Sequence, residues 1–543
     1  MSTLERAKSH IHPVVFPVSA GLIVLFVLYG ALFSDNAGEV LGEVRTWITS
    51  NLGFFMIFTI AFLVVFCLWL AIGKSGNVRL GPDDSTPDFS YLTWFAMLFS
   101  AGMGIGLVFW GVAEPAMHFA EGPQMETPGE TAAEAMLLTF HHWGLGAWSV
   151  YAVLGLSLAY FGFRHNLPMT VRSALYPLIG NRIHGPIGNL VDVLAIFGTM
   201  FGIATSLGLG VAQIATGLDR VFGTGDSIPL QIVLIAVITL AATISVVSGI
   251  DKGIRRLSEI NINLAGLLLL FVALAGPTLA IVTAYADNIG NYIQNFVNVL
   301  FWGGTYDDPS VWTGDAGWYS SADGWLADWT IFYWAWWISW APFVGMFIAR
   351  ISRGRTIREF ILGVLLVPSA VSFLWFTVMG NTALIWALDG TADIVGVTIE
   401  QGSTVAMFAL LEELPAATFM SIVTIIVITL FFVTSSDSGS FVIDMIASGG
   451  SLDPPKAMRV FWATSEGVVA AVLLAAGGLG ALQAGAIATG FPFAIVLIVV
   501  AIGVAKGLNT EARGRIVVRP EDQFEQDHTG GMSEEAQQQA TDN

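Results

Sequence analysis

The part of the sequence with the most distinctive chemistry is a run of residues from Asp328 to Trp340, which holds five of the chain's 18 tryptophans. On a helix, which turns about 100° per residue, the aromatic side chains of this region share one face with an arc of roughly 120°. They are Tyr333, Trp336, Trp337, Trp340, Phe343 and Phe347. Indole faces attract cations, and aromatic cages bind quaternary ammonium groups, which have no N–H to donate. The alternative is an interfacial aromatic belt, but belt residues lie at span ends and these continue into the span.

A second aromatic set is formed by Trp143, Trp148 and Tyr151. On a helix these three side chains share an arc of about 140°. By itself this set is more typical of core or lipid-facing aromatic residues. Together with the first set it indicates two aromatic walls of one cavity.

Three glycines alternate in the segment Gly102-Met-Gly-Ile-Gly106. Each glycine weakens a helix by about 1 kcal/mol relative to alanine. Broken transmembrane helices are where transporters expose backbone groups to substrates and ions. Close packing of helices through small residues explains the same pattern equally well.

Hydroxyl groups cluster between Phe431 and Ser440, beside the acidic Asp437. They belong to Thr434, Ser435, Ser436, Ser438 and Ser440. Neutral oxygens of this kind, with backbone carbonyls, suit a sodium ion. The alternative is that the hydroxyls bond back to their own helix.

Further acids, Asp192, Asp444 and Glu466, lie in or near apolar runs. A carboxylate in a membrane usually has a partner and a function. We expect the partners of these acids to be loop cations, hydrogen-bond donors or protons.

The composition defines the class of protein. Of the 543 residues, 55% are hydrophobic and 12% are charged, and the mean hydropathy is +0.71. A soluble fold of this size could not hide so much apolar surface. The composition excludes a cytosolic enzyme, a nucleic-acid binder and a disordered chain, and it predicts an all-α membrane protein. The single cysteine, Cys67, excludes an intrachain disulfide.

Apolar runs of about 20 residues, long enough to cross a bilayer, predict twelve spans. Their ranges are 13–33, 52–73, 91–118, 132–161, 187–218, 229–249, 260–285, 329–349, 359–381, 416–447, 457–477 and 485–505. With both termini in the cytoplasm, 20 of the 22 Lys and Arg lie on the cytoplasmic side, and only Arg45 and Arg220 lie outside. The positive-inside rule therefore supports this orientation in the plasma membrane. Between the spans, Ile289 to Leu300 is amphipathic and could lie along the interface.

Motifs of other classes are missing. There is no G-x-x-x-x-G-K-[ST], H-E-x-x-H or G-x-S-x-G, so an ATP-driven pump, a zinc protease and a serine hydrolase are disfavoured. His141 and His142 are adjacent, so they point to different helix faces, unlike a zinc pair four residues apart. No channel filter is visible. The remaining class is a secondary transporter, not an enzyme, with no cofactor and no nucleic-acid partner.

Taken together, these segments resemble the betaine/choline/carnitine transporter family. The stretch from Asp328 to Trp340 matches the family signature, including Trp-Thr-x-x-Tyr-Trp-x-Trp-Trp, and the other segments match in order and spacing. The resemblance covers about residues 13–505. It implies twelve transmembrane helices in a LeuT-type fold, in which spans 3–7 and 8–12 form two inverted five-helix repeats behind two N-terminal helices, and a homotrimer in the lipid bilayer.

The resemblance also implies a division of the chain. It comprises a cytoplasmic tail (1–12), two peripheral helices (13–90), a first repeat (91–285), an outer loop with an amphipathic helix (286–328), a second repeat (329–505) and a cytoplasmic tail (506–543).

By position, the resemblance implies an ammonium cage with Phe347 on the cytoplasmic exit. The cage residues would be Trp143, Trp148, Tyr151, Trp336, Trp337 and Trp340, next to Met103, Gly104 and Gly106. One sodium site would use the hydroxyls of Thr434 and Ser435, backbone oxygens near Ser100 and Met103, and Phe431. A second sodium site would use Thr199 and Phe343, but the second threonine of the family is Ile203 here, and Thr205 or Ser206 would have to compensate.

The substrate is inferred from one glycine and one absence. Proton-coupled choline carriers similar to this family tend to have Asp where this chain has Gly106, and a carboxylate there would repel a zwitterion. Sodium-independent carnitine exchangers place a cation near the first sodium site, and none is present on spans 3, 5, 8 or 10. Both observations favour sodium-coupled uptake of a zwitterionic quaternary-ammonium solute, glycine betaine first.

Other functions stay open at this point. The same fold could carry choline, carnitine, ectoine or dimethylsulfoniopropionate, as a proton-coupled carrier or an exchanger. An ion channel gated by the aromatic face and an osmosensor are the alternatives from other classes. The polar C-terminal tail, with only acidic and neutral residues after Arg519, disfavours stress sensing through a basic helix.

Overall fold

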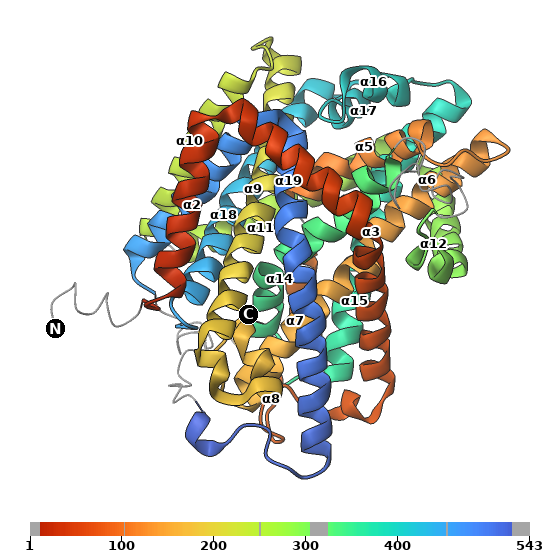
Figure 1. The fold of residues 1–543 in the computed structure, drawn as a ribbon. Helices are drawn as coiled ribbons and strands as arrows, with labels where there is room; N and C mark the ends of the chain where they lie inside the picture. Colours follow the sequence, from red (N-terminus) through yellow and green to blue (C-terminus); the bar gives the residue numbers. More distant parts are fainter. Residues whose placement is uncertain (1–10, 103, 249–250, 305–323, 452–453, 524–543) are drawn as a thin grey trace.

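The computed structural model describes residues 11–102, 104–248, 251–304, 324–451 and 454–523 (Figure 1). This part of the chain is helical, with one isolated β-bridge between Arg79 and Thr356. Ten of its helices are long and apolar enough to cross a membrane. The fold is therefore all-α, as the composition predicts.

Besides a few short π- and 3₁₀-helical turns, the described part of the chain contains α-helices. In chain order they are α2 (Val15–Leu32), α3 (Ser34–Ile72), α4 (Tyr91–Gly102), α5 (Ile105–Glu121), α6 (Pro128–Trp143), α7 (Leu145–Ala159), α8 (Tyr176–Ile179), α9 (Pro186–Phe222), α10 (Ile228–Ser248), α11 (Asp251–Ala275), α12 (Thr278–Leu300), α14 (Phe332–Arg350), α15 (Ile357–Asp389), α16 (Ile394–Gln401), α17 (Ala406–Glu412), α18 (Ala417–Ala447) and α19 (Lys456–Ala512). The π- and 3₁₀-helical turns are η1 (Lys74–Asn77), η2 (Tyr160–Arg164), η3 (Val171–Leu175), η4 (Gly180–His184), η5 (Ala327–Ile331) and η6 (Pro520–Asp522).

Most predicted spans coincide with one helix, and the exceptions have local causes. The span 91–118 is divided between α4 and α5, and 132–161 is divided between α6 and α7. The span 260–285 is wrong at its end, because α11 stops at Ala275 and Pro277 cannot donate a helical hydrogen bond. The spans 457–477 and 485–505 both lie in α19, which is kinked where Gly478 has the left-handed φ of +60°.

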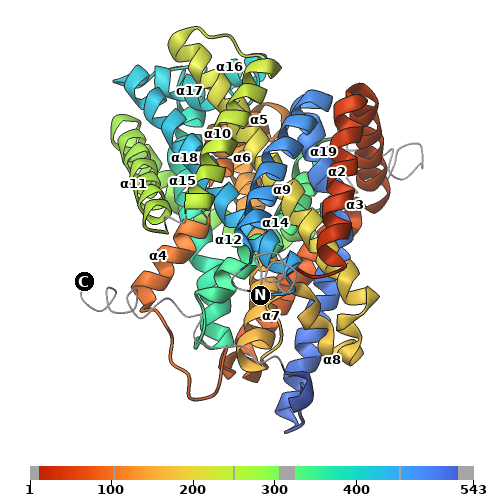
Figure 2. The ribbon, with the colours of Figure 1, turned by 90° about the vertical axis from the view of Figure 1, so that its left-hand side faces the viewer.

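Central and peripheral helices differ in burial. In the most apolar stretch of α6 and α7, 94% of the residues are buried, and in α9 the share is 83%. The corresponding share is 22% for α2 and for α11 and 28% for α10. Figure 2 shows α11 at the edge of the bundle and α14 inside it. The exposed leucines and valines of the outer helices form the apolar surface that a lipid bilayer would cover.

The amphipathic stretch from Ile289 to Leu300 is helical, as its periodicity predicts, and belongs to the longer α12. This helix packs on α6 and α15. The Tyr292 hydroxyl accepts a hydrogen bond from the backbone N–H of Leu145 at 3.2 Å. It thereby satisfies a free donor at the start of α7, directly beside the break at Gly144.

Because α19 and α14 are in close contact, we expect one added methyl group at their interface to lower the stability of the protein. A Cβ at Gly490 would lie 2.4 Å from the carbonyl oxygen of Ala335. Gly490→Ala must therefore separate the two helices, at a cost of about 1–3 kcal/mol. We expect a lower apparent melting temperature of the purified protein in detergent.

The matched control is Gly480→Ala on the same helix, where a Cβ meets nothing within 4 Å. It should leave the melting temperature unchanged or raise it, because alanine favours a helix. Equal melting temperatures for the two variants would contradict this account of the packing.

Candidate functional site

A cavity of about 200 Å³ lies inside the helix bundle. Its lining comes from α5, α6, α7, α9, α11, α14 and α18. A cavity of about 150 Å³ in another protein accommodates benzene, so this one has room for a small organic molecule. It is the candidate binding site.

The two aromatic sets predicted from the sequence meet at this cavity. The residues of both sets that line it are Trp143, Trp148, Tyr151, Trp336, Trp337, Trp340, Phe343 and Phe347. Trp336 and Trp337 are stacked with ring centroids 4.8 Å apart, and Trp143 meets Trp337 edge-on at 4.8 Å. Tyr151 faces Trp337 at 6.3 Å. Tyr333, predicted on the same helix face, is fully buried behind this wall and is not among the lining residues.

The glycine segment forms the opposite side of the cavity. The helix is interrupted here: α4 ends at Gly102, Gly104 is extended, and α5 begins at Ile105. Gly104 and Gly106 line the cavity, whereas Met103 lies outside the described residues. A Cβ at Gly106 would lie 2.8 Å from the Trp336 ring and 2.9 Å from the Trp143 ring. Only glycine leaves room for both indoles in these positions.

Hydroxyl groups of α18 line the same cavity. They belong to Thr434, Ser435 and Ser438, next to the Phe431 ring. The Thr434 hydroxyl donates to the carbonyl of Leu430 at 2.9 Å, which is the back-bonding alternative. Its oxygen keeps a lone pair free to accept or coordinate.

Only some of the remaining residues predicted to bind sodium line the same cavity as these hydroxyl groups. The side chain of Ser100 lies outside the described part of the chain. Thr199 on α9 is buried, and its hydroxyl has no hydrogen-bond partner among the described residues. It does not line the cavity that Phe343 lines. Ile203 is also buried and offers no oxygen. Ser206 lines the cavity, and Thr205 donates to backbone carbonyls instead.

The acids near the spans have partners of the expected kinds. Asp192 forms a buried ion pair with the loop cation Arg172 and also accepts from its backbone N–H at 3.1 Å. The Arg172 guanidinium also lies beside His12. Burial and this neighbouring positive charge lower the pKa of the His12 imidazole. Glu466 accepts a hydrogen bond from Ser436 at 2.8 Å. These groups stabilise helix contacts outside the cavity.

Asp444, the last of these acids, faces a cation at the end of a helix. Its carboxylate lies 3.9 Å from the guanidinium nitrogen Nε of Arg459. All three acids follow the rule that ionisable groups inside a membrane protein are matched to a partner.

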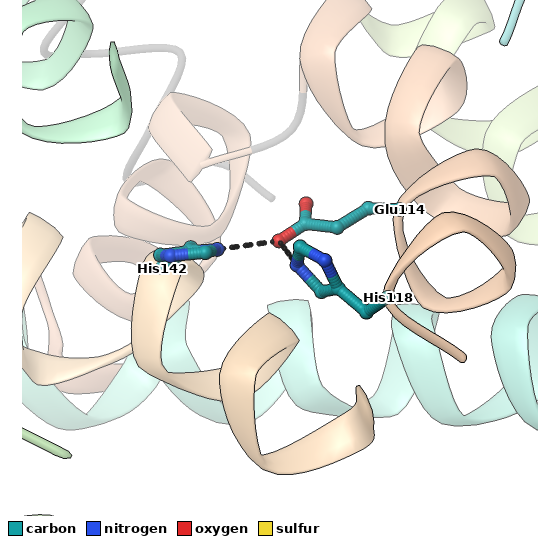
Figure 3. A group of neighbouring side chains, drawn as sticks. All are labelled: Glu114, His118 and His142. Atoms are coloured by element: carbon teal, nitrogen blue, oxygen red, sulfur yellow. Dashed lines mark hydrogen bonds and ion pairs between the residues drawn. The ribbon is translucent and has the colours of Figure 1, made fainter. Parts of the chain in front are cut away.

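A buried polar network behind the aromatic wall was not predicted. Its centre is Glu114, whose side chain is fully buried beside His118 and His142 (Figure 3). Glu114 accepts hydrogen bonds from the indole N–H of Trp143 at 2.7 Å and from the Tyr333 hydroxyl. The sequence did carry a signal, because Glu114 is an acid inside the predicted span 91–118. Its partners are distant in sequence, and only folding brings them together.

The charge of the cavity lining limits the kind of ligand that it suits. Among the described residues that line it there is no Asp, Glu, Lys, Arg or His. A ligand with a net charge would therefore lose its hydration without gaining a counter-ion in contact. The lining offers ring faces, hydroxyls and backbone groups instead.

A long bundle of apolar helices around an uncharged, ligand-sized cavity defines a multi-pass membrane protein of the transporter type. Residues 14–513 match the family described as betaine/carnitine/choline family transporters. The chain is 46% identical to the glycine betaine/proline/choline transporter of Vibrio parahaemolyticus, over 93% of this chain and 91% of that protein. It is 42% identical to the glycine betaine transporter of Bacillus subtilis, over 92% of this chain and 95% of that protein.

A further relative is the high-affinity choline transport protein of Escherichia coli, with 42% identity over 93% of this chain and 73% of that protein. The chain belongs to the betaine/carnitine/choline transporter family. The family predicted from the sequence motifs is thereby confirmed, as is the prediction of a transporter rather than an enzyme.

Proposed function

We propose that this protein takes up glycine betaine by sodium-coupled symport with alternating access. The observation that carries the proposal is the cavity walled by aromatic faces, with no charged side chain among the described residues that line it. Each ring in contact with a trimethylammonium group contributes about 0.5–2 kcal/mol. A zwitterion has no net charge to compensate, so an uncharged lining suits it better than it suits choline. The names of the relatives from Vibrio and Bacillus support this substrate class.

The coupling ion in this proposal is sodium, bound at the hydroxyls of Thr434 and Ser435. These hydroxyls line the same cavity as the aromatic wall, and sodium prefers oxygen ligands, as other hard cations do. Ion binding holds α18 against the glycine segment and so favours the substrate-binding form of the cavity. A second sodium ion at Thr199 and Phe343 would lack one ligand, because Ile203 has no side-chain oxygen. Sodium is therefore assigned to the first site, at Thr434 and Ser435.

The wider architecture proposed here follows the family. It comprises twelve spans, with two inverted five-helix repeats in a LeuT-type fold, both termini in the cytoplasm, and a homotrimer in the plasma membrane. Interrupted helices at the cavity, as between α4 and α5, are a feature of that fold. The 57 residues of α19 are enough for two spans, which the kink at Gly478 separates.

The sodium proposal predicts the behaviour of purified protein in proteoliposomes. An inward sodium gradient should accelerate uptake of radiolabelled glycine betaine above the rate with an equal potassium gradient. Unlabelled choline, carnitine, ectoine and dimethylsulfoniopropionate, added in excess, should each compete less well than unlabelled betaine. Equal uptake under both gradients would contradict sodium coupling. Stronger competition by choline than by betaine would show that choline is the preferred substrate.

The shape of the cavity predicts that Gly106→Ala weakens betaine binding. Its methyl group overlaps the rings of Trp336 and Trp143, and overpacking of about 1–3 kcal/mol corresponds to roughly 5- to 150-fold weaker binding. The measurement is the KM for betaine uptake. Gly266→Ala, on α11 with nothing within 4 Å of the added Cβ, is the control. A normal KM in Gly106→Ala would exclude this cavity as the site.

The proposed ion site predicts that Thr434→Ala raises the sodium concentration needed for half-maximal uptake, whereas Thr434→Ser retains the hydroxyl and the wild-type value. Thr429→Ala is the control, because Thr429 lies on the same helix and also donates to its own backbone, at 2.8 Å. Both alanine variants lose one back-bond. Equal sodium dependence in the two would show that Thr434 has no part in ion binding.

A further inference from the structure

Glu114 joins three helices behind the aromatic wall. On one oxygen it accepts the Trp143 indole N–H at 2.7 Å and the Tyr333 hydroxyl. The other oxygen lies 2.8 Å from Nδ1 of His142 and 3.2 Å from Nε2 of His118. Figure 3 shows both rings directed at this oxygen. Residues of α5, α6 and α14 are thus fixed by one carboxylate.

The network extends to a second tryptophan of the wall. His142 lies with its Nε2 at 2.9 Å from the Thr330 hydroxyl. Its ring stacks on Tyr333 at 4.7 Å, and its backbone carbonyl accepts the Trp337 indole N–H at 2.8 Å. Two cavity tryptophans, Trp143 and Trp337, are therefore oriented through Glu114 and its neighbour.

Glu114, His118 and His142 lie close enough to suggest a metal site, but the contacts favour a hydrogen-bond network. A carboxylate has about four acceptor positions, and the four groups around Glu114 use them. An ion would have to displace hydrogen bonds that already satisfy a fully buried group. Hydrogen bonds to both oxygens favour the ionised carboxylate and so oppose the burial that disfavours its charge.

The position of this carboxylate has an electrostatic consequence. An indole that donates to an anion is polarised, as hydrogen bonds in series polarise one another, so the ring face of Trp143 becomes more negative. Cation–π attraction depends on that negative face. Glu114 sits outside the cavity, where it would not meet the carboxylate of a zwitterionic ligand. Through the Trp143 ring, the charge of Glu114 strengthens the attraction for the ammonium group of the ligand without bringing a carboxylate near the ligand's own carboxylate.

We propose that Glu114 is the positioning residue of the aromatic cage, which orients Trp143 and strengthens the cation–π attraction of its ring for a quaternary ammonium group. This inference rests on the proposed function, because it concerns the same cavity. It assigns a role in specificity to a residue that does not contact the substrate.

The test compares glycine betaine with 3,3-dimethylbutanoate, its carbon isostere, which has the same shape and carboxylate but an uncharged head. For each unlabelled compound, the concentration that halves the uptake of labelled betaine is measured. The ratio of the two concentrations reports the contribution of the positive charge on the head group. In Glu114→Gln this preference for betaine should fall on the order of fivefold, the scale of one cation–π contact. Glu121→Gln, exposed on the same helix, should retain the wild-type ratio.

Two further variants separate the electrostatic role from a structural one. Glu114→Asp keeps the charge and should keep the ratio, even where both constants rise together. Trp143→Phe keeps a ring but removes the N–H, so it should lower the ratio by itself. Adding Glu114→Gln to Trp143→Phe should then cause no further fall. If Glu114→Gln does not fold, a wild-type ratio in Trp143→Phe still overturns the role of Glu114, because loss of the indole N–H would then leave the preference for the charged head unchanged.

The outcomes distinguish the inference from the function beneath it. A wild-type protein that neither transports nor binds betaine overturns both. A wild-type protein that transports betaine, with the same ratio in Glu114→Gln and in Trp143→Phe as in wild type, overturns the role of Glu114 and leaves the proposed function intact. A lower ratio in both single variants, without addition in the double variant, is the expected result.

Discussion

The cavity depends on one kind of interaction: the N–H of a buried indole donates to an acceptor on a neighbouring helix, as it does for two tryptophans of the aromatic wall. Trp143 finds the carboxylate of Glu114, and Trp337 finds the carbonyl of His142. Each of these bonds crosses from one helix to another, so satisfying the donors also fixes the rings. An aromatic wall of this size would otherwise be free to repack, because ring contacts alone are weakly directional. The polar network therefore defines the shape of the apolar site.

Large rings on one side of a helix bundle require small residues on the other, because protein interiors are packed without room to spare. Gly106 faces the rings of Trp336 and Trp143, and a Cβ at Gly202 would lie 2.5 Å from Trp340. The breaks at Gly104 and Gly144 lie beside the same wall. Interrupted helices also leave backbone groups free at the cavity. These positions therefore require glycine for two reasons: it leaves space for the aromatic rings, and it allows helix breaks that leave backbone groups available at the cavity.

The bilayer imposes a second constraint, since an unpaired charge in hydrocarbon is expensive. The chain meets it by pairing acids with loop cations, as in Asp192 with Arg172, or with neutral donors, as in Glu466 with Ser436. The cavity lining, in the described part of the chain, is free of ionisable groups. The carboxylate of Glu114 lies directly behind the Trp143 ring, and its proposed effect on a ligand is exerted through that ring.

The sequence by itself determined the helical membrane class, the family, and the residue types of the site. These follow from hydropathy over about 20 residues and from aromatic spacing on single helices, which are local properties. It located Trp336, Trp337 and Trp340 on one face, and it singled out Gly106. It could not show that α6 and α14 bring their rings together, that α11 ends before Pro277, or that Thr199 lies away from the cavity. Only the tertiary structure decided those points and the convergence of residues from three helices on Glu114, because contacts between distant segments depend on how the helices pack.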